Sequence, residues 1–358
     1  MFLNHALRQP VAGYIKEKEM ENSKIRFAVV GCCNMANRHS DGIAAIDGAE
    51  LVCVCDIDEA KAKKRSEERG VPYYLDYYEM LKAGGFEAVI ICTPDQIHRE
   101  QAVAALEAGY HVLCEKPLAL TMEDCRAIVE ASHKSKGIFM VGQVCRMTPG
   151  FVKAKELVDA GEIGDIFFIE SEYAHDYSHI NSPWRLDPVK LRHGITGGGC
   201  HAVDLIRWIA GDPTEVSAYS NHMVLDNWPV DDCTIAIMKF PSGALGKVFC
   251  SIGCKRNYTM RTVIYGTKGT IICDNRSPEI QLFQPKVNAE GRPYWEPDLY
   301  PVELKDHNAE EEVKLFYNAI VNGLSSPVPA EEGANTVAVC DACVRASASG
   351  KAEKPEYV

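Results

Sequence analysis

The chain has 358 residues, a length typical of two domains, and 46% of them are hydrophobic, which is ample for two cores. Its formal net charge of −12 argues against nucleic acid or an anionic membrane as a partner. No apolar run approaches the ~20 residues that span a bilayer. Residues 1–23 lack the apolar core of a signal peptide and are interpreted as a loose N-terminal extension.

Residues 24–145 alternate short apolar strands with helices. Strands that are apolar along their whole length, with helices between them, are typical of a parallel sheet covered on both faces. The pattern therefore predicts a doubly wound, Rossmann-type α/β domain over 24–145. Its strands are predicted at 24–30, 50–55, 88–92, 110–114 and 138–141, and its helices at 41–46, 59–69, 77–83, 100–108 and 122–136.

Residues 146–358 follow a different pattern, in which strands succeed one another without helices between them. Hairpin-like turns such as 241–243 join some of these strands. The pattern predicts an α+β domain over 146–358, built on a mainly antiparallel sheet. Its strands are predicted at 166–172, 216–224, 233–240, 244–252, 262–265 and 270–273, and its helices at 151–160, 201–209, 310–322 and 331–349. The acidic run 310–314 is interpreted as a solvated helix face.

Fifteen cysteines are present, and many of them stand inside apolar strand patterns, as Cys53 and Cys92 do. A free thiol in such a place packs as a small hydrophobe. The adjacent pair Cys32-Cys33 lacks the Cys-x-x-Cys spacing of a zinc or redox site. Because no export signal is evident, the cysteines are interpreted as reduced, and a cytoplasmic location is expected.

The turn after the first predicted strand reads GCCNMA over 31–36, where the dinucleotide fingerprint has Gly-x-Gly-x-x-Gly/Ala. Gly31 suits the tight turn, and Ala36 allows close packing of helix on strand. Cys33 is a departure, because its thiol takes up space where the backbone normally approaches the pyrophosphate. Gly31 and Cys33, together with Asn34 and Met35, are the predicted pyrophosphate contacts.

Asp56 ends the second predicted strand. An acidic side chain at this place accepts hydrogen bonds from the adenosine ribose hydroxyls and repels a 2′-phosphate. The neighbours Ile57 and Asp58 offer no arginine for that phosphate. NAD is therefore the expected cofactor, in preference to NADP.

Glu115-Lys116-Pro117 follows the strand predicted at 110–114. A residue before proline is held in an extended backbone. The Lys116 ammonium can then point into the crevice beyond the carboxyl ends of a parallel sheet, where α/β proteins bind ligands. This position predicts that Lys116 meets both the hydride acceptor and a substrate hydroxyl.

Further motifs occur in a specific order along the chain. They are Thr93-Pro94 with His98, Arg146 with Pro149, Trp184-Arg185, and Gly197-Gly198-Gly199 before His201 and Asp204. Together with the two motifs above, they resemble the family of glucose–fructose oxidoreductase, inositol dehydrogenase and rhizopine-catabolism proteins (Gfo/Idh/MocA), from about Ile25 to the C-terminus. The resemblance implies a Rossmann domain followed by an open-faced antiparallel sheet that often forms the oligomer contact. It also implies NAD(P)-linked chemistry at a carbinol of a sugar, inositol or related polyol.

The resemblance also assigns roles to individual residues. It implies that His201 is the general base and that Lys116 stabilises negative charge on the same oxygen. The residues it implies for the cofactor are Thr93, Pro94, His98, Glu115, Lys116, Gln143, Trp184 and Arg185. Those implied for the substrate are Lys116, Arg146 and His201, with Asp176 and Tyr177 as further candidates.

One position departs from the family pattern. Relatives often carry an aspartate four residues before the histidine, and Gly197 stands there in this chain. Asp176 or Tyr177 is the candidate to supply the missing polar group, whereas Asp204 is interpreted as structural. Without a carboxylate at 197, the pKa of His201 is expected to lie near or below about 6.5.

The expected function is NAD-dependent oxidation of a secondary alcohol of a sugar, glycoside or inositol, by a homodimer or homotetramer formed through the C-terminal sheet. Two alternatives remain open: a non-catalytic sugar- and NAD-binding regulator on the same fold, and an NAD-dependent glycosidase. His175, His179 and His193 match no strong metal motif, and relatives usually need no metal. No metal is therefore expected.

Overall fold

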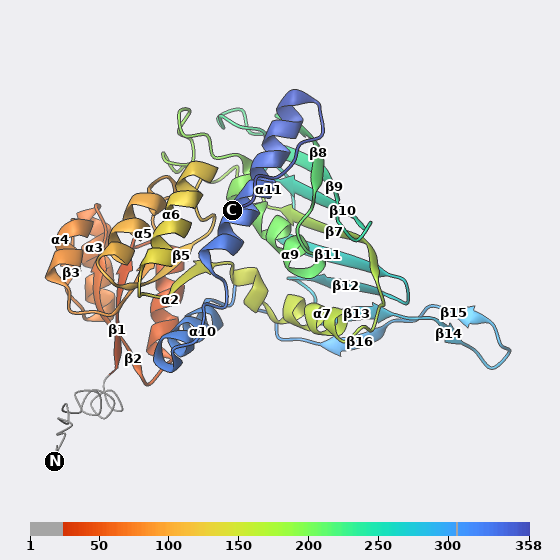
Figure 1. The fold of residues 1–358 in the computed structure, drawn as a ribbon, viewed down its shortest axis with the longest axis horizontal. Coiled ribbons are helices and arrows are strands. Elements are labelled where there is room, and N and C mark those ends of the chain that lie inside the picture. Colours follow the sequence, from red (N-terminus) through yellow and green to blue (C-terminus); the bar gives the residue numbers. More distant parts are fainter. Residues whose placement is uncertain (1–23, 306) are drawn as a thin grey trace, which may run out of the picture.

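The computed structural model describes residues 24–305 and 307–358 of the chain. The expected N-terminal extension, 1–23, lies outside the described residues. Two sheets dominate the described part, a smaller one formed by the first half of the chain and a larger one formed by the second (Figure 1). The expected fold class is confirmed.

The first sheet is parallel and has the strand order β3-β2-β1-β4-β5-β6. Its central strands are buried along their length, as the apolar pattern predicts. The reversal of strand order between β1 and β4 places a ligand-binding crevice at their carboxyl ends. The strands are β1 (Ile25–Val30), β2 (Ala49–Cys55), β3 (Tyr73–Tyr74), β4 (Ala88–Ile91), β5 (His111–Glu115) and β6 (Phe139–Gly142).

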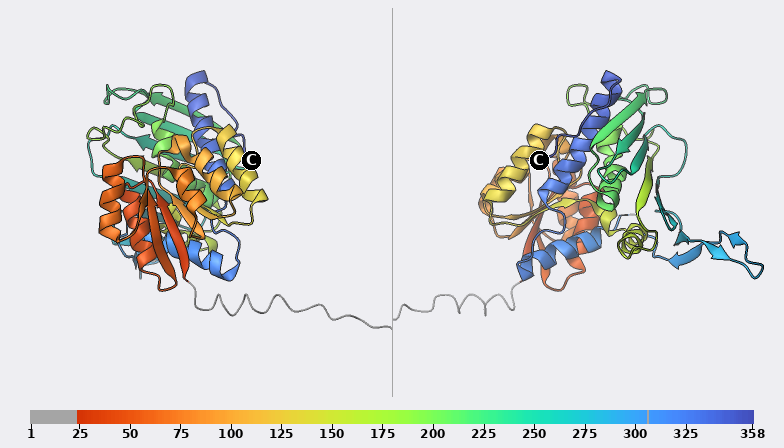
Figure 2. Two further views of the ribbon diagram at one scale, coloured as in Figure 1. Left: turned by 90° about the vertical axis from the view of Figure 1, so that its left-hand side faces the viewer. Right: turned by 45° about the vertical axis from the view of Figure 1, so that its right-hand side comes forward.

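Helices cover both faces of this sheet (Figure 2). Most begin with a side chain that accepts a hydrogen bond from a free amide of the first turn, as Asp58, Asp76 and Thr121 do. The helix after β1 is different, because Cys33 precedes it without capping it. These helices are α2 (Asn34–Ala44), α3 (Glu59–Arg69), α4 (Tyr77–Ala83), α5 (His98–Glu107) and α6 (Met122–Lys134).

The second sheet has eight strands in the order β16-β13-β12-β11-β7-β10-β9-β8. Only the pair β7–β10 among them is parallel, so the sheet is mainly antiparallel as expected. The strands are β7 (Ile166–Ala174), β8 (Glu215–Asn221), β9 (Cys233–Lys239), β10 (Leu245–Ser251), β11 (Thr259–Gly266), β12 (Thr270–Asp274), β13 (Glu279–Phe283) and β16 (Asp298–Pro301). The sequence pattern missed β13 and β16.

One face of the second sheet is covered and the other is open. Along β9, buried and exposed residues alternate, which is the pattern of a strand with one solvated face. The covering helices are α7 (Pro149–Asp159), α9 (Cys200–Ala210), the short α8 (Gly194–Gly197) and part of α11 (Ala330–Ser349). Between β13 and β16, the short strands β14 (Lys286–Val287) and β15 (Pro293–Tyr294) form an arm that projects from the body (Figures 1 and 2).

The two C-terminal helices join both halves of the molecule. Helix α10 (Ala309–Asn322) packs on α2 and inserts Val313 and Phe316 into the first core. Helix α11 contributes Val337 to the first core and Cys340 to the second. No helix among the described residues is long and apolar enough to cross a membrane.

Candidate active site

The turn between β1 and α2 is shaped by Gly31. Its φ is +84°, and a Cβ there would lie 2.7 Å from the Cys92 carbonyl oxygen. Any side chain would therefore both strain the backbone and collide with β4. The turn opens a cavity of about 910 Å³ at the carboxyl ends of β1, β2, β4 and β5, and Gly31, Cys33, Asn34 and Met35 all line it.

Cys33 stands at the start of α2, exposed to this cavity. As a thiol, its Sγ donates to the Cys92 carbonyl oxygen at 3.4 Å. As a thiolate, it accepts a hydrogen bond from the Cys92 side chain, which lowers the pKa of Cys33 to about 6; the amides of Ala36 and Met35 act in the same direction. Burial and the Glu115 carboxylate oppose this shift without reversing it.

Asp56 lies at the carboxyl end of β2 in the same cavity. Its carboxylate accepts from the Cys32 amide at 2.7 Å and from the Asp58 amide at 2.9 Å, so its position is fixed. The structure adds cations that the sequence pattern did not place here. Lys61, Lys64 and Arg65 also line the cavity, but Lys61 pairs with Asp58 and Arg65 with Glu68.

The ends of β4 and β5 are tied together by His98. Its Nδ1 lies 3.0 Å from the Pro117 oxygen, and its Nε2 lies 3.0 Å from the Thr93 oxygen. Thr93 is held further by a 2.6 Å hydrogen bond from its hydroxyl to Gln101 Oε1. Thr93, Pro94 and His98 all line the cavity. His98 therefore borders the cofactor site and also holds the backbone at Thr93 and Pro117 in place.

Glu115 and Lys116 end β5 and line the cavity as expected. The His39 ring lies 2.8 Å from Glu115 Oε1. Burial alone would raise the pKa of Glu115, but the hydrogen bond and charge of His39, together with the charges of Lys116 and His307, lower it overall. No hydrogen bond or ion pair to a described residue holds the Lys116 ammonium, which leaves its protons for a ligand.

Glu312 approaches the same place from α10. It is fully buried, and its Oε2 lies 3.9 Å from His39 Nε2. Burial and the charge of Glu115 raise the pKa of Glu312 well above its ordinary value. The prediction that residues 310–314 form a solvated helix face is thus wrong for Glu312, because α10 turns this side chain towards α2.

His39, Glu115 and Glu312 are the one group of three potential metal ligands that converges within 24–305 and 307–358. Neither oxygen of Glu312 has a hydrogen-bond partner. A protonated Glu312 leaves one negative charge on the pair of carboxylates, and the Lys116 ammonium lies close enough to affect both.

Trp184 and Arg185 line the cavity from the loop after β7. Gln96 Nε2 donates to the Trp184 oxygen at 2.6 Å and so ties this loop to the first domain. Two guanidinium groups lie near the Trp184 ring, with Arg185 Cζ at 4.6 Å and Arg192 Cζ at 5.1 Å from its centroid. Arg192 is a residue of the cavity that no sequence motif indicated.

Gly197 makes room for Arg192. A Cβ at residue 197 would lie 1.9 Å from Arg192 Nη1 and 2.4 Å from its Cζ. The guanidinium donates through Nε to Asp95 Oδ2 at 2.5 Å and through Nη2 to the Gly197 oxygen at 3.0 Å. Neither Asp176 nor Tyr177 fills this place, because Arg192 already does.

His201 is buried in the first turn of α9. Its Nδ1 lies 3.3 Å from Cys145 Sγ, and the Tyr173 ring stacks on it at 6.1 Å between centroids. Burial lowers the pKa of His201 well below its ordinary value, and the charges of Lys116, His307 and Arg192 lower it further. The expectation for this pKa is confirmed, and it places Lys116 and Arg192 in the neighbourhood of the imidazole.

Aromatic rings extend from His201 over the second sheet. Tyr173 Oη lies 2.7 Å from Tyr177 Oη, and the His175 ring contacts Tyr177 and Tyr258 at 4.9 and 4.7 Å between centroids. Asp176 points elsewhere. Hydrogen bonds from Ser178, then one from Lys255, lower the pKa of Asp176 to about 2.

Two other residues predicted for the site, Arg146 and Gln143, lie outside the cavity. Arg146 donates to Asp204 at 2.9 and 2.7 Å and to Glu332 at 2.7 Å, in a network that joins α9 to α11. This engagement argues against its expected contact with substrate, and it supports the structural role of Asp204. Gln143 is buried, and neither it nor Arg146 lines the cavity.

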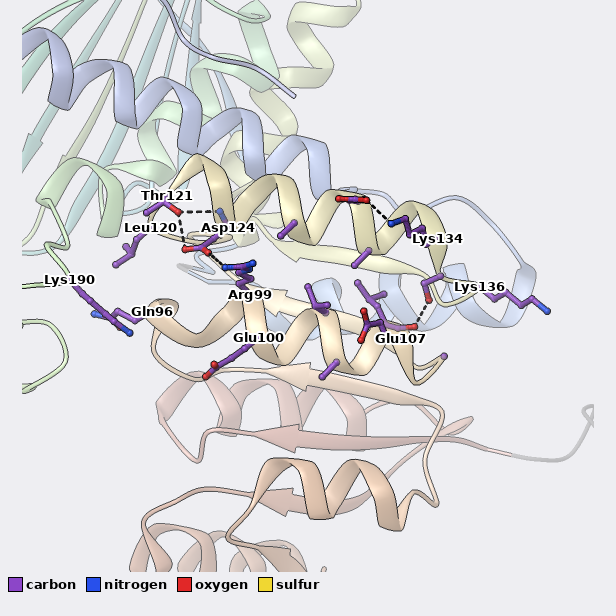
Figure 3. Close-up of a pocket in the computed structure, with 18 of the residues that line it drawn as sticks. Gln96, Arg99, Glu100, Glu107, Leu120, Thr121, Asp124, Lys134, Lys136 and Lys190 are labelled. Atoms are coloured by element: carbon purple, nitrogen blue, oxygen red, sulfur yellow. Dashed lines mark hydrogen bonds and ion pairs between the residues drawn. The ribbon is translucent and has the colours of Figure 1, made fainter.

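A second, larger groove of about 1270 Å³ runs along the outside of α5 and α6 (Figure 3). Its lining contains no histidine, cysteine or aromatic residue. Four of its charged side chains are paired with one another, Arg99 with Asp124 at 3.2 Å and Lys134 with Glu130 at 2.6 Å. The groove therefore offers no chemistry comparable with that of the cavity at the strand ends.

Comparison with known proteins agrees with this geometry. Residues 25–143 match the model of an oxidoreductase family with an NAD-binding Rossmann fold, and residues 151–272 match the Gfo/Idh/MocA C-terminal domain. The scyllo-inositol 2-dehydrogenase (NAD(+)) of Bacillus subtilis is 30% identical over 255 residues, which cover 69% of this chain and 73% of that protein. The chain belongs to the Gfo/Idh/MocA family.

Other members of the Gfo/Idh/MocA family are similar over more of the chain. The myo-inositol 2-dehydrogenase of Thermotoga maritima is 27% identical over 316 residues, which cover 86% of this chain and 92% of that protein. An oxidoreductase domain protein from Kribbella flavida is 26% identical, with a TM-score of 0.83 and coverage of 93% and 100%. A levoglucosan dehydrogenase in complex with NADH and L-sorbose shares the fold, with a TM-score of 0.85 at 24% identity and coverage of 94% and 100%. NAD is the cofactor of this Gfo/Idh/MocA dehydrogenase, as Asp56 predicts.

Proposed function

We propose that the protein transfers hydride between NAD and a secondary alcohol of a sugar, glycoside or inositol. The observation that carries this proposal is the position of Lys116. Its ammonium lines the cofactor cavity without a partner among the described residues, and its charge reaches the buried imidazole of His201. Relatives that act on inositols and levoglucosan support the substrate class.

The cavity fits NAD on features of this chain. Gly31 keeps the backbone open where a Cβ would meet β4, and the start of α2 turns free amides towards the pyrophosphate site. Asp56 is fixed where the ribose hydroxyls would lie. When bound, the nicotinamide supplies the hydride acceptor. Trp184 borders the cavity and helps to exclude water from it.

Cys145 sets the tautomer that lets His201 act as a base. Cys145 Sγ lies 3.3 Å from His201 Nδ1 and 3.5 Å from Met260 Sδ. In the arrangement proposed here, the thiol donates to Met260 Sδ and its sulfur accepts from His201 Nδ1. That arrangement leaves Nε2 unprotonated and able to accept a hydroxyl proton. The lowered pKa keeps the imidazole neutral before reaction, as a general base requires.

Lys116 stabilises the charge that develops on the substrate oxygen. Its ammonium can donate to the same hydroxyl that His201 deprotonates, and a donor aimed at a developing alkoxide is worth about 3 kcal/mol. The alternative of a non-catalytic regulator is less well supported. The regulator rested on the absence of a carboxylate at Gly197, and both groups needed for proton removal and charge stabilisation are present.

The test is an activity screen of the purified protein with NAD. The panel contains myo-inositol, scyllo-inositol, levoglucosan and common sugars, and the absorbance of the reduced nicotinamide reports turnover. Reduction of NAD by one or more members is the expected result. NAD binding without turnover of any member would contradict the proposal and would favour the regulator.

We also propose that the protein is a homo-oligomer joined through the open face of the second sheet. Large apolar side chains are exposed there, including Tyr219 at 77%, Ile237 at 55% and Leu245 at 46%. Light scattering of the purified protein tests the oligomeric state, since a monomer would contradict the proposal.

We propose a cytoplasmic location as well. The fifteen cysteines are all free, which supports a reducing, cytoplasmic compartment.

A further inference from the structure

Arg192 is a buried cation with one nitrogen left for a ligand. Its side chain is 4% exposed and it lines the cofactor cavity. Nε and Nη2 donate to Asp95 and to the Gly197 oxygen. Nη1 has no hydrogen-bond partner within the described part of the chain. A guanidinium nitrogen without a partner at a cavity wall can donate a hydrogen bond to an acceptor from outside the chain.

The guanidinium is held rigidly in this position. The ion pair with Asp95 and the carbonyl of Gly197 fix its plane, and the Trp184 ring covers it. Its Nη1 lies where a side chain of residue 197 would project, one helical turn before His201. The place that a carboxylate takes in relatives is therefore filled by a group of opposite charge.

The charged groups near His201 that can still bind a ligand are mostly hydrogen-bond donors. Lys116 and Arg192 are cations, and both affect the His201 imidazole, as His307 does. Three nearby carboxylates are paired with cations or histidine: Asp95 with Arg192, Glu115 with His39, and Asp204 with Arg146. The carboxylate oxygens here that have no hydrogen-bond partner, Asp95 Oδ1 and those of Glu312, are fully buried.

This donor-rich site suits one kind of substrate. A neutral polyol offers hydroxyl groups, and each hydroxyl donates a hydrogen bond as well as accepting one. Carboxylates that are already paired with cations are poor acceptors for those hydroxyl protons. A carboxylate only accepts, and its two oxygens can take hydrogen bonds from two cationic groups at once.

We propose that Arg192 determines specificity by binding a carboxylate of the substrate beside the reacting carbinol, so that the enzyme prefers acidic sugars to neutral polyols. This inference rests on the proposed dehydrogenase function. Uronic and aldonic acids are the substrate class that fits. Arg192 Nη1 donates to one carboxylate oxygen, and Lys116 remains on the reacting hydroxyl.

The experiment compares matched acidic and neutral substrates with the parent enzyme and NAD. The pairs are D-glucuronate against D-glucose, D-galacturonate against D-galactose, and D-gluconate against myo-inositol. Hydrogen bonds to a charged group are worth about 10- to 150-fold in specificity, so kcat/KM should favour at least one acid by that factor. Neutral members that are turned over equally well or better would overturn the inference and leave the dehydrogenase function intact.

A double variant tests the residue itself. Asp95→Asn with Arg192→Met removes the cation without leaving a buried carboxylate unpaired. It should lose the preference for the acid, because kcat/KM should fall about 10- to 150-fold more for the acid than for its neutral partner. Lys190→Met, an exposed cation on the same loop, is the matched control and should keep the preference. Equal losses for acid and neutral substrates would overturn the role in substrate selection.

Calorimetry separates this inference from the proposed function. Each acid and its neutral partner are titrated into the parent protein saturated with NADH, and thermal melting checks that the double variant is folded. Tighter binding of the acid, lost in the double variant, supports the inference even where no substrate is turned over. Equal binding of both partners overturns it, whether or not the enzyme is active.

Discussion

Cys33 should be alkylated by iodoacetamide faster than an ordinary thiol in mildly acidic solution. It is exposed at the pyrophosphate turn, and its neighbours lower its pKa to about 6. The thiolate is the reactive form, and a low pKa populates it where other cysteines are still protonated. NAD should protect Cys33, because the pyrophosphate would lie over its sulfur.

The size of the effect follows from two opposing factors. Near pH ~6, half of Cys33 is thiolate, against ~0.3% of a thiol with a pKa of about 8.5. A weaker base is also a weaker nucleophile, and with a Brønsted coefficient of ~0.45 this difference in pKa costs about 13-fold. Cys33 should therefore react about tenfold faster than a free thiol near pH ~6, and the advantage should vanish by pH ~7.5.

Peptide mass spectrometry after timed labelling measures the rate at each pH, with and without NAD. Cys254 is a useful internal reference, because it is half-buried and burial raises its pKa. Cys33→Gly, which removes the side chain, should bind NAD at least as tightly as the parent. An inflection near the ordinary thiol pKa, or a labelling rate that NAD leaves unchanged, would refute this account of the turn.

Five further outcomes are expected. Because Asp56 would face a 2′-phosphate, NADP should bind at least tenfold more weakly than NAD, and fluorescence titration of both cofactors tests this. His201→Ala should lower kcat by about 10²–10⁴-fold and Lys116→Ala by a comparable factor, with NAD binding spared; near-parent turnover in either variant would remove that residue from the mechanism. The acid limb of the oxidation rate should lie well below pH ~6.5, because burial depresses the pKa of His201. Cys145→Val should lower kcat without changing KM for NAD, whereas Cys145→Ser, which can still accept from the ring, should recover most of it. Glu312 has a raised pKa in the fold, so its contribution to stability is complete below the unfolded pKa of about 4.3 and is lost as pH rises towards the folded value. Chemical denaturation should show that Glu312→Gln removes this decline, and an unchanged slope would mean that the carboxyl is ionised.

The sequence predicted the fold because local patterns decide it. Apolar runs placed the parallel strands, and Gly31 and Asp56 marked the ends of the first two. Site residues could be predicted where they belong to a short sequence motif, as Lys116 and His201 do. Arg192 and Glu312 were missed because each acts through a partner far away in the chain. Nothing near Arg192 indicates that it fills the space left by Gly197, and an acidic run gives no sign that Glu312 will be buried against His39.

The C-terminal helices restrict how a substrate reaches this site. Domains joined by one flexible linker can open a cleft by rotating apart. Here α11 packs on α6 and β6 of the first half and on β8 and α9 of the second, so rotation would expose buried side chains such as Val337, which is worth about 1.5–3 kcal/mol of burial. Access must therefore be controlled by the segment 175–193, which contains no helix or strand and carries both Trp184 and Arg192. The residues proposed to select the substrate thus lie on the part of the molecule that can admit it.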